Sequence, residues 1–178
     1  MPLIDYGHTH FGENKVQESI EKWSSIKKNN NQIKLHMIGK LQTNKVKQAV
    51  DLFDYIHSVD NYKLAEKISS EILKKKKKIK ILIQVNIGNE IQKSGIKFED
   101  TKQFLYECKN NLNLDVIGLM CIPPVGSSSD DYFKKMNILS KELNLNELSM
   151  GMSQDYLSAT LNDASFVRIG SKILGPRT

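Results

Sequence analysis

Two short apolar segments near the C-terminus end in small residues that could bind an anion. Ser153 follows "ELSMGM", and Gly170 with Ser171 follows "FVRI". Backbone N–H groups and hydroxyls can hold a phosphate where the chain approaches closely, which Gly and Ser allow and larger side chains prevent. We therefore predict a phosphate site with hydroxyls from Ser153 and Ser171 and amides from Gly170 and Ser171. Structural roles stay open, because Ser153 could cap a helix predicted at 154–161 and Gly170 could be a turn glycine.

Arg168 adds a cation to the same region. It lies two residues before Gly170, so on a strand its side chain would share the face of Gly170. An arginine directed at a strand-lined interior needs a partner, because charged side chains are rarely buried alone. Its position therefore favours a binding site over a purely structural role.

The elements that position these residues alternate between strand and helix. Helical spacing of apolar residues occurs at 15–28, which includes Trp23, and at 62–73, which includes Ile68. Trp23 is therefore expected in the core. The apolar strand segments are "HTHFGEN", "IKLHMIG", "YIHSVD", "IKILIQVNI", "LDVIGLMCI", "ELSMGMS" and "FVRIGSKIL". This alternation predicts parallel strands joined by crossover helices, and the β-branched run "KILIQVNI" predicts a strand covered on both faces.

The place of the polar residues bears on which parallel architecture is present. Parallel α/β folds carry their sites at the carboxyl ends of the strands, in open sheets and barrels alike. Neither GxGxxG nor GxxxxGK[ST] follows the first strand segment, so the nucleotide-binding motifs of an open sheet are missing. A (βα)8 barrel commonly binds phosphate through the loops after its last two strands, where Ser153 and Gly170 lie. The pattern favours a barrel.

Length and composition are those of one domain, predicted to span 1–178. The chain has 178 residues with 39% hydrophobic content, which allows a real core. No apolar run reaches the roughly 18 residues of a membrane span, and the N-terminus lacks signal-peptide features, so we expect a cytoplasmic protein without a membrane partner. Cys108 and Cys121 are far apart and predicted to be core thiols, and we expect no metal site.

The net charge of +6 makes a nucleic-acid partner a hypothesis to weigh. Much of the excess lies in the five consecutive lysines 74–78, which end a helical pattern just before a strand. Lysines there complement the negative end of the helix and remain solvated. We therefore do not expect nucleic acid to be the main partner.

Seven blocks in order along the chain together resemble a known family. They are "HFGENKVQE", "HMIGKLQTNK", "HSVDN", "LIQVNIGNEIQKSGI", "GLMCIPP", "LSMGMSQD" and "VRIGSKILG". The sequence resembles the pyridoxal phosphate homeostasis protein family, whose fold is similar to the alanine racemase N-terminal barrel. The resemblance implies an α/β fold, a (βα)8 TIM-type barrel of the alanine racemase N-terminal type, that binds pyridoxal 5′-phosphate (PLP).

The resemblance also implies roles for individual residues. Ser153, Gly170 and Ser171 match the positions that hold the cofactor phosphate, and Arg168 matches the arginine that faces the pyridine nitrogen. The polar residues that match other strand ends, and could line the cofactor face, are Asn14, His36, Ser58 and Asn86. Each of these four could instead be a capping or turn residue, and His36 could be a satisfied core histidine.

The implied function is intracellular storage and delivery of PLP, with PLP-dependent apoenzymes as candidate partners. A charged guanidinium beside the pyridine nitrogen disfavours protonation of that nitrogen, which weakens the ring as an electron sink. The resemblance therefore implies a protein that binds the cofactor and is not a strong catalyst.

The sequence departs from the family at its start. The family carries its Schiff-base lysine on the first strand, and the printed chain begins inside the helix that follows. Seven strand segments are found where a closed barrel has eight, and barrels usually exceed roughly 200 residues. We expect an N-terminally incomplete barrel that lacks strand one and its lysine. The lysines near strand ends, to none of which that role is assigned, are Lys40, Lys45, Lys93 and Lys172.

Two other function classes remain open from the sequence. The first is a TIM-barrel enzyme acting on a phosphorylated small metabolite, because a phosphate site does not choose its ligand. The second is a basic RNA-binding module, which the charge favours but no aromatic-rich strand motif supports.

Overall fold

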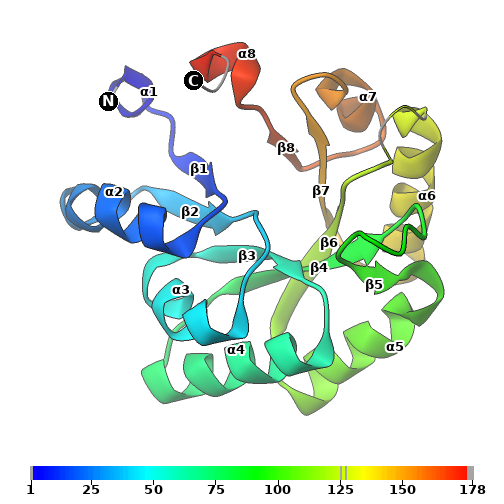
Figure 1. The fold of residues 1–178 in the computed structure, drawn as a ribbon, viewed down its shortest axis with the longest axis horizontal. Helices are drawn as coiled ribbons and strands as arrows, with labels where there is room; N and C mark the ends of the chain where they lie inside the picture. Colours follow the sequence, from blue (N-terminus) through cyan, green and yellow to red (C-terminus); the bar gives the residue numbers. More distant parts are fainter. Residues whose placement is uncertain (1, 125, 127, 176–178) are drawn as a thin grey trace.

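The computed structural model describes residues 2–124, 126 and 128–175, and its centre is one curved parallel sheet. The strands lie in the order β1-β2-β3-β4-β6-β7-β8, with the short β5 paired to β4 beside this path. Figure 1 shows the sheet curving from β1 round to β8 with the helices on its outer side. The bounds are β1 His10–Glu13, β2 Lys34–Met37, β3 Tyr55–Val59, β4 Lys80–Asn86, β5 Ile96–Lys97, β6 Asp115–Cys121, β7 Glu147–Met152 and β8 Phe166–Arg168.

The helices connect successive strands, as the alternating pattern predicts. Their bounds are α1 Pro2–Asp5, α2 Val16–Asn29, η1 Thr43–Lys45, α3 Val46–Leu52, α4 Tyr62–Lys75, η2 Phe98–Asp100, α5 Thr101–Tyr106, η3 Glu107–Asn111, α6 Ser129–Glu142, α7 Tyr156–Leu161 and α8 Ser171–Leu174. Trp23 on α2 is buried, as are Leu64 and Ile68 on α4, which confirms the apolar faces predicted for both helices. The architecture is a TIM-type barrel, nearly closed, with helices alternating around it.

The core is centred on β4, which is covered on both faces. Ile81, Leu82 and Ile83 are consecutive in the strand and are all fully buried. Because successive side chains of a strand point to opposite faces, both faces of β4 must be packed. Cys108 and Cys121 are buried too, and burial raises the pKa of each thiol to about 12, so both are neutral core thiols as predicted.

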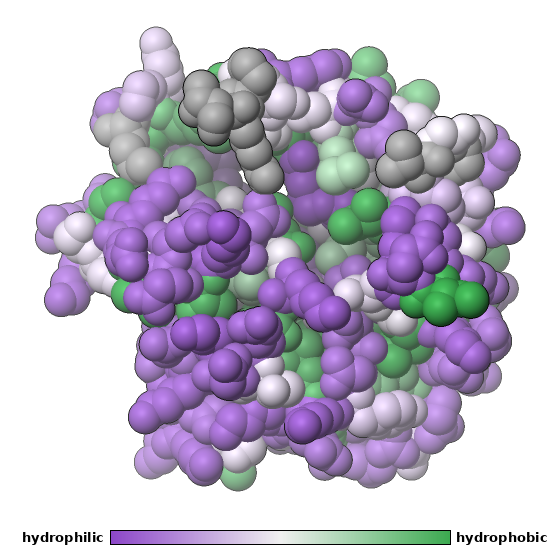
Figure 2. Space-filling model, viewed as in Figure 1, coloured by the Kyte–Doolittle hydropathy of each residue, from purple (hydrophilic) through white to green (hydrophobic). Residues whose placement is uncertain are grey.

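The lysine run ends α4 at the surface. Lys76 has the left-handed backbone conformation that stops the helix, with φ of 51°. Lys75 forms an ion pair with Asp51, so part of the positive charge is neutralised locally. Figure 2 shows a mainly hydrophilic surface on the face in view. No helix in the described part of the chain is long and apolar enough to cross a membrane.

The last predicted strand is shorter than the sequence pattern indicates. The segment "FVRIGSKIL" reads as one apolar strand, but β8 ends at Arg168 and Ser171–Leu174 form the short helix α8. The carbonyl oxygen of Gly170 accepts hydrogen bonds from the N–H groups of Ile173 and Leu174, which turns the chain into α8. Gly170 therefore lies outside the strand, and the prediction that it shares a strand face with Arg168 is wrong.

Candidate functional site

Ser153 and Gly170 meet at the carboxyl ends of β7 and β8. The Gly170 N–H donates to Ser153 Oγ, with 3.3 Å between the two atoms. Ser153 does not cap the next helix, because α7 begins at Tyr156 and its N-cap residue is Asp155. Since Ser153 Oγ accepts the Gly170 N–H, its own hydroxyl proton is available to another acceptor.

The space beside Gly170 is open. A Cβ built on Gly170 would meet no heavy atom of the described residues within 4 Å, apart from its chain neighbours. Ser171 begins α8, and the first N–H groups of a helix have no partner within that helix. Two hydroxyls, the amide of Ser171 and an unfilled space at a glycine suit a phosphate, so the residues present fit that part of PLP.

Arg168 is held in place from two neighbouring strands. Its Nη1 donates to Ser149 Oγ on β7 at 2.8 Å, and its Nη2 donates to the carbonyl oxygen of Cys121 on β6 at 2.9 Å. Burial lowers the pKa of the guanidinium, although arginine remains charged because its ordinary pKa is very high. The two bonds use two of five N–H donors and fix the plane of the group.

Three histidines extend this arrangement across the inside of the barrel. His57 Nδ1 lies 2.8 Å from Ser149 Oγ, His57 Nε2 lies 2.9 Å from His36 Nδ1, and His36 Nε2 lies 2.9 Å from His10 Nδ1. His36 and His57 are buried, whereas His10 on β1 is exposed. Together with Ser149 and Arg168 these residues are called the histidine chain below.

The surroundings of the histidine chain keep the imidazoles neutral. Burial is the largest cause that lowers the pKa of His57 well below its ordinary value, and the neighbouring His36 and Arg168 lower this pKa further. Burial, followed by His10, lowers the pKa of His36 to about 3. Burial also lowers the pKa of His10, which His8 and Lys34 reinforce. At neutral pH the histidine chain therefore carries one positive charge, that of Arg168.

Aromatic rings enclose the two buried histidines. Tyr55 stacks on His36 with ring centroids 4.1 Å apart and an interplanar angle of 11°. Phe166 on β8 lies against both His36 and His57, with centroids 5.4 Å apart in each case. In the described residues no group of three or more His, Cys, Asp or Glu side chains is arranged to hold a metal ion. The distances between the three histidines and Ser149 show that the cluster is a hydrogen-bonded network.

Asn14 and Asn86 lie at a second place on the same end of the barrel. Both line a cleft of about 350 Å³ at the carboxyl ends of β1, β2, β4 and β6, together with Gly39, Lys40 and Lys93 among others. Both polar groups of the Asn86 side chain already form hydrogen bonds, since Nδ2 donates to the Glu90 carbonyl oxygen and Oδ1 accepts a hydrogen bond from the Glu90 N–H.

The remaining predicted residues are placed differently from one another. His36 lies inside the barrel and reaches Arg168 only through His57 and Ser149. Ser58 is buried on β3, and its Oγ has no hydrogen-bond partner among the residues the structure describes. The structure therefore brings Ser153 and Gly170 together and links His36 to Arg168, but it shows no such link for Ser58.

Sequence reasoning missed His10, His57 and Ser149. A usable signal was present, because His57 and Ser149 each interrupt an apolar strand segment at a position where a core residue would be expected. A buried polar residue needs a hydrogen-bond partner, so two such residues on different strands could have been paired as a hypothesis.

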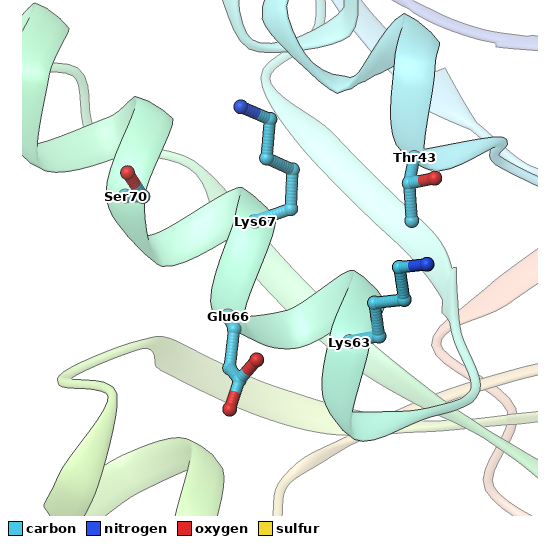
Figure 3. Close-up of a pocket in the computed structure, with 5 residues that line it drawn as sticks. All are labelled: Thr43, Lys63, Glu66, Lys67 and Ser70. Carbon is cyan, nitrogen blue, oxygen red and sulfur yellow. The ribbon is translucent and has the colours of Figure 1, made fainter.

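A larger groove lies on the outer helical layer and contains none of the predicted site residues. It has a volume of about 460 Å³ and is lined by Thr43, Lys63, Glu66, Lys67 and Ser70. Figure 3 shows four of these side chains on α4 and Thr43 on η1. Lys67 is paired with Glu71, and the lysines are solvent-exposed, so this groove is an ordinary charged helix surface.

Comparison with known proteins gives a consistent result. Residues 1–178 match the family described as alanine racemase, N-terminal domain. The pyridoxal phosphate homeostasis protein of Aquifex aeolicus (strain VF5) is 38% identical over 176 residues, which cover 94% of this chain and 76% of that protein. The protein of the same name from Pasteurella multocida (strain Pm70) is 35% identical over 181 residues, covering 96% and 78%.

Solved structures show the same similarity. PipY of Synechococcus elongatus PCC7942 without PLP superposes with a TM-score of 0.91 at 33% identity, covering 98% of this chain and 85% of that chain. PipY with PLP bound gives a TM-score of 0.88 at 31% identity with the same coverage. An alanine racemase of Clostridium difficile 630 gives 0.72 at 16% identity, covering 94% and 45%, and shares the fold alone.

Proposed function

The chain belongs to the pyridoxal phosphate homeostasis protein family, and on that premise we propose that it binds PLP and serves in PLP homeostasis. The observation that carries this proposal is the meeting of Ser153 and Gly170 beside an open space. The PLP-bound structure of the related PipY supports PLP as the ligand.

The phosphate of PLP would be held after β7 and β8. The donors would be the hydroxyls of Ser153 and Ser171 and the backbone amide of Ser171, while the Gly170 amide donates to Ser153 Oγ and orients that hydroxyl. This group of three residues is called the phosphate cup below. Because these donors are neutral and a backbone amide is fixed in direction, the cup selects an anion through the geometry of its hydrogen bonds.

Arg168 would face the pyridine ring. When bound, PLP supplies an electron sink whose strength depends on protonation of its ring nitrogen. A permanently charged guanidinium next to that nitrogen disfavours the additional proton. We therefore propose that the protein stores and delivers PLP, with cytoplasmic PLP-dependent apoenzymes as recipients, and is not a strong catalyst.

The other predicted residues have smaller roles in this proposal. Asn14 and Asn86 would form part of the rim on the far side of the barrel mouth, and His36 would act through the histidine chain. Ser58 stays a prediction without a supporting contact. As a proposal, residues 1–178 form a single barrel domain.

A direct test compares PLP binding by the unmodified chain with binding by Ser153→Ala. Loss of one donor to a charged group should weaken PLP binding by about 1 to 3 kcal/mol, measured by equilibrium dialysis with detection of the cofactor's visible absorbance. The matched control is Ser24→Ala, since Ser24 is an exposed serine on α2 whose hydroxyl donates to the Ile20 carbonyl. Equal affinity in all three proteins would contradict the proposal, as would tight binding of a phosphorylated metabolite by a chain that does not bind PLP.

A further inference from the structure

An unbroken line of hydrogen bonds runs from the solvent to the guanidinium of Arg168. It starts at the exposed His10 on β1, passes through the buried His36 and His57, and reaches Arg168 through the Ser149 hydroxyl. Strands β1, β2 and β3 are thereby joined to β7 and β8 across the barrel interior. The proposed contacts of PLP use only Arg168 of these five residues.

The direction of every bond follows from Arg168. A guanidinium is a donor only, so Ser149 Oγ must accept from Arg168 Nη1. Ser149 is fully buried, and its remaining described partner is His57 Nδ1. The Ser149 hydroxyl can be satisfied only if it donates its proton to His57 Nδ1, which must therefore be unprotonated.

The same reasoning fixes the two histidines beyond His57. A neutral imidazole with an unprotonated Nδ1 carries its proton on Nε2, so His57 Nε2 donates to His36 Nδ1. His36 is then also protonated on Nε2 and donates to His10 Nδ1. The bonds run head to tail, and all three histidines are in the Nε2–H form.

A proton on His57 Nδ1 would break this order at Ser149. The serine oxygen would then face two donors, Arg168 and His57, while its own proton would have no described acceptor. The cations around the histidine chain oppose an additional proton that would charge an imidazole, because Lys27 acts on His36, Lys34 acts on His10 and Arg168 acts on His57, whereas Asp54 favours protonation of His10 and His36. Tyr55, which stacks on His36, has a pKa that burial raises, so it is neutral as well, and Cys121 and Asp155 act on Arg168 at the other end.

We propose that His57, His36 and Ser149 are positioning residues for Arg168. The tautomers of the two histidines keep Ser149 Oγ an acceptor, and this acceptor fixes the guanidinium plane that would face the pyridine nitrogen. This inference rests on the proposed PLP site for its functional consequence. The orientation of Arg168, and with it the electronic state of the bound cofactor, then depends on a histidine that does not touch the cofactor.

Imidazole ¹⁵N shifts of the 178-residue chain without ligand test the order of the bonds. Two-bond ¹H–¹⁵N correlation spectra distinguish a protonated Nε2 from a protonated Nδ1. We expect the Nε2–H form for both His36 and His57 at neutral pH. A protonated Nδ1 on His57 would overturn the proposal, and this measurement needs neither a variant nor PLP.

A pair of variants tests the functional consequence. In His57→Asn, the amide oxygen lies near the former Nδ1 and can still accept from Ser149, whereas His57→Leu offers no acceptor. We expect the absorbance maximum of bound PLP to shift in His57→Leu and to return most of the way toward the unmodified value in His57→Asn. The control His8→Asn changes an exposed histidine outside the histidine chain and should leave the spectrum unchanged.

The outcomes separate this inference from the proposed function. Unshifted spectra in both His57 variants, or equal shifts in both, would overturn the positioning role. If the unmodified chain binds no PLP while His57 is in the Nε2–H form, the proposed function fails and the hydrogen-bond order stands. If His57→Leu does not fold, Ser149→Ala replaces it, because that change removes the acceptor of Arg168 Nη1 directly and should shift the spectrum as well.

Discussion

Arg168 shows how one side chain depends on partners from two other strands. Its donors meet a serine hydroxyl on β7 and a carbonyl oxygen on β6, each within 3 Å. Lysine would keep the charge but cannot donate in two fixed directions, because its ammonium is a single point at the end of a flexible stem.

Arg168→Lys should therefore change the cofactor site more than the net charge suggests. We expect a shifted absorbance spectrum of bound PLP and a loss of about 1 to 3 kcal/mol in the free energy of unfolding, since Ser149 and the Cys121 carbonyl lose a fixed donor. Urea unfolding and visible absorbance measure the two effects. Parent-like values for both would show that the fork geometry of arginine is unimportant here.

The buried histidines predict a stability that falls on acidification. The pKa of His36 is about 3 in the folded protein, below its ordinary value of 6.5, so below pH 6.5 the unfolded chain binds a proton that the folded chain does not. The stability that neutral His36 contributes is complete above pH 6.5 and is lost as the pH falls toward 3. The slope from His36 is about 1.4 kcal/mol per pH unit.

Replacing His36 should flatten this dependence. We expect His36→Gln to be less stable than the parent at pH 7 but to lose less stability between pH 6.5 and 4.5, as measured by urea unfolding at each pH. His8→Gln removes an exposed histidine and should keep the parent slope. An unchanged slope in His36→Gln would contradict the lowered pKa of this residue.

At the residue scale, the sequence is sufficient for some contacts and insufficient for others. Ser153, Gly170 and Arg168 could be proposed from residue type and from their place after predicted strands. The bond between His57 and Ser149 joins residues 92 positions apart. It depends on the curvature that places β3 opposite β7, and the alternation within one strand reports only a face.

Two glycines at the scale of the elements serve opposite purposes. A Cβ on Gly118 of β6 would collide with the Glu147 carbonyl oxygen of β7, and these two residues are register partners. A Cβ on Gly170 would enter open space. The first glycine permits two strands to approach, and the second keeps room in the phosphate cup.

The two alanine variants should therefore have separate effects. Gly118→Ala should destabilise the protein by about 1 to 3 kcal/mol or prevent folding, because backbone must move. Gly170→Ala should change stability by no more than about 0.5 kcal/mol but weaken PLP binding, because the methyl group occupies the open space. Thermal unfolding and equilibrium dialysis distinguish them. A Gly170→Ala protein with parent affinity would place the phosphate elsewhere.

The elements themselves were largely predictable, and the exception has a physical reason. Strand and helix segments follow the hydrophobic period, so seven of the eight described strands and the helices expected at 15–28 and 62–73 were predicted correctly, whereas the two-residue β5 was not predicted. Ile173 and Leu174 read as a continuation of β8 because they are apolar, yet both are exposed on α8. Apolar character alone does not distinguish a strand end from a short helix whose side chains remain uncovered.

At the scale of the whole molecule, the strands in the middle of the sheet are paired on both sides and those at its edges on one side only, among the described residues. Strands β4 and β6 have neighbours on both sides, whereas β1 and β8 each pair with one strand among the described residues. The histidine chain and Phe166 tie the two edges together through side chains instead of a backbone ladder.

Amide hydrogen exchange should follow this order. We expect the slowest exchange in β4 and β6, whose ladders are buried and doubly paired, and faster exchange in β1 and β8. Mass spectrometry of peptic fragments resolves these segments. Slower exchange in β8 than in β4 would show that the edges are better protected than the described pairing implies.

The central claim is that the phosphate cup after β7 and β8 anchors PLP, and the most direct test removes the phosphate from the ligand. Isothermal titration calorimetry of the 178-residue chain should show PLP binding at one site and pyridoxal, which lacks the phosphate, binding at least about tenfold more weakly, equivalent to roughly 1.4 kcal/mol. In Ser153→Ala the difference between the two ligands should shrink, because only PLP uses the missing hydroxyl. Equal affinity for PLP and pyridoxal in the unmodified chain would contradict the account.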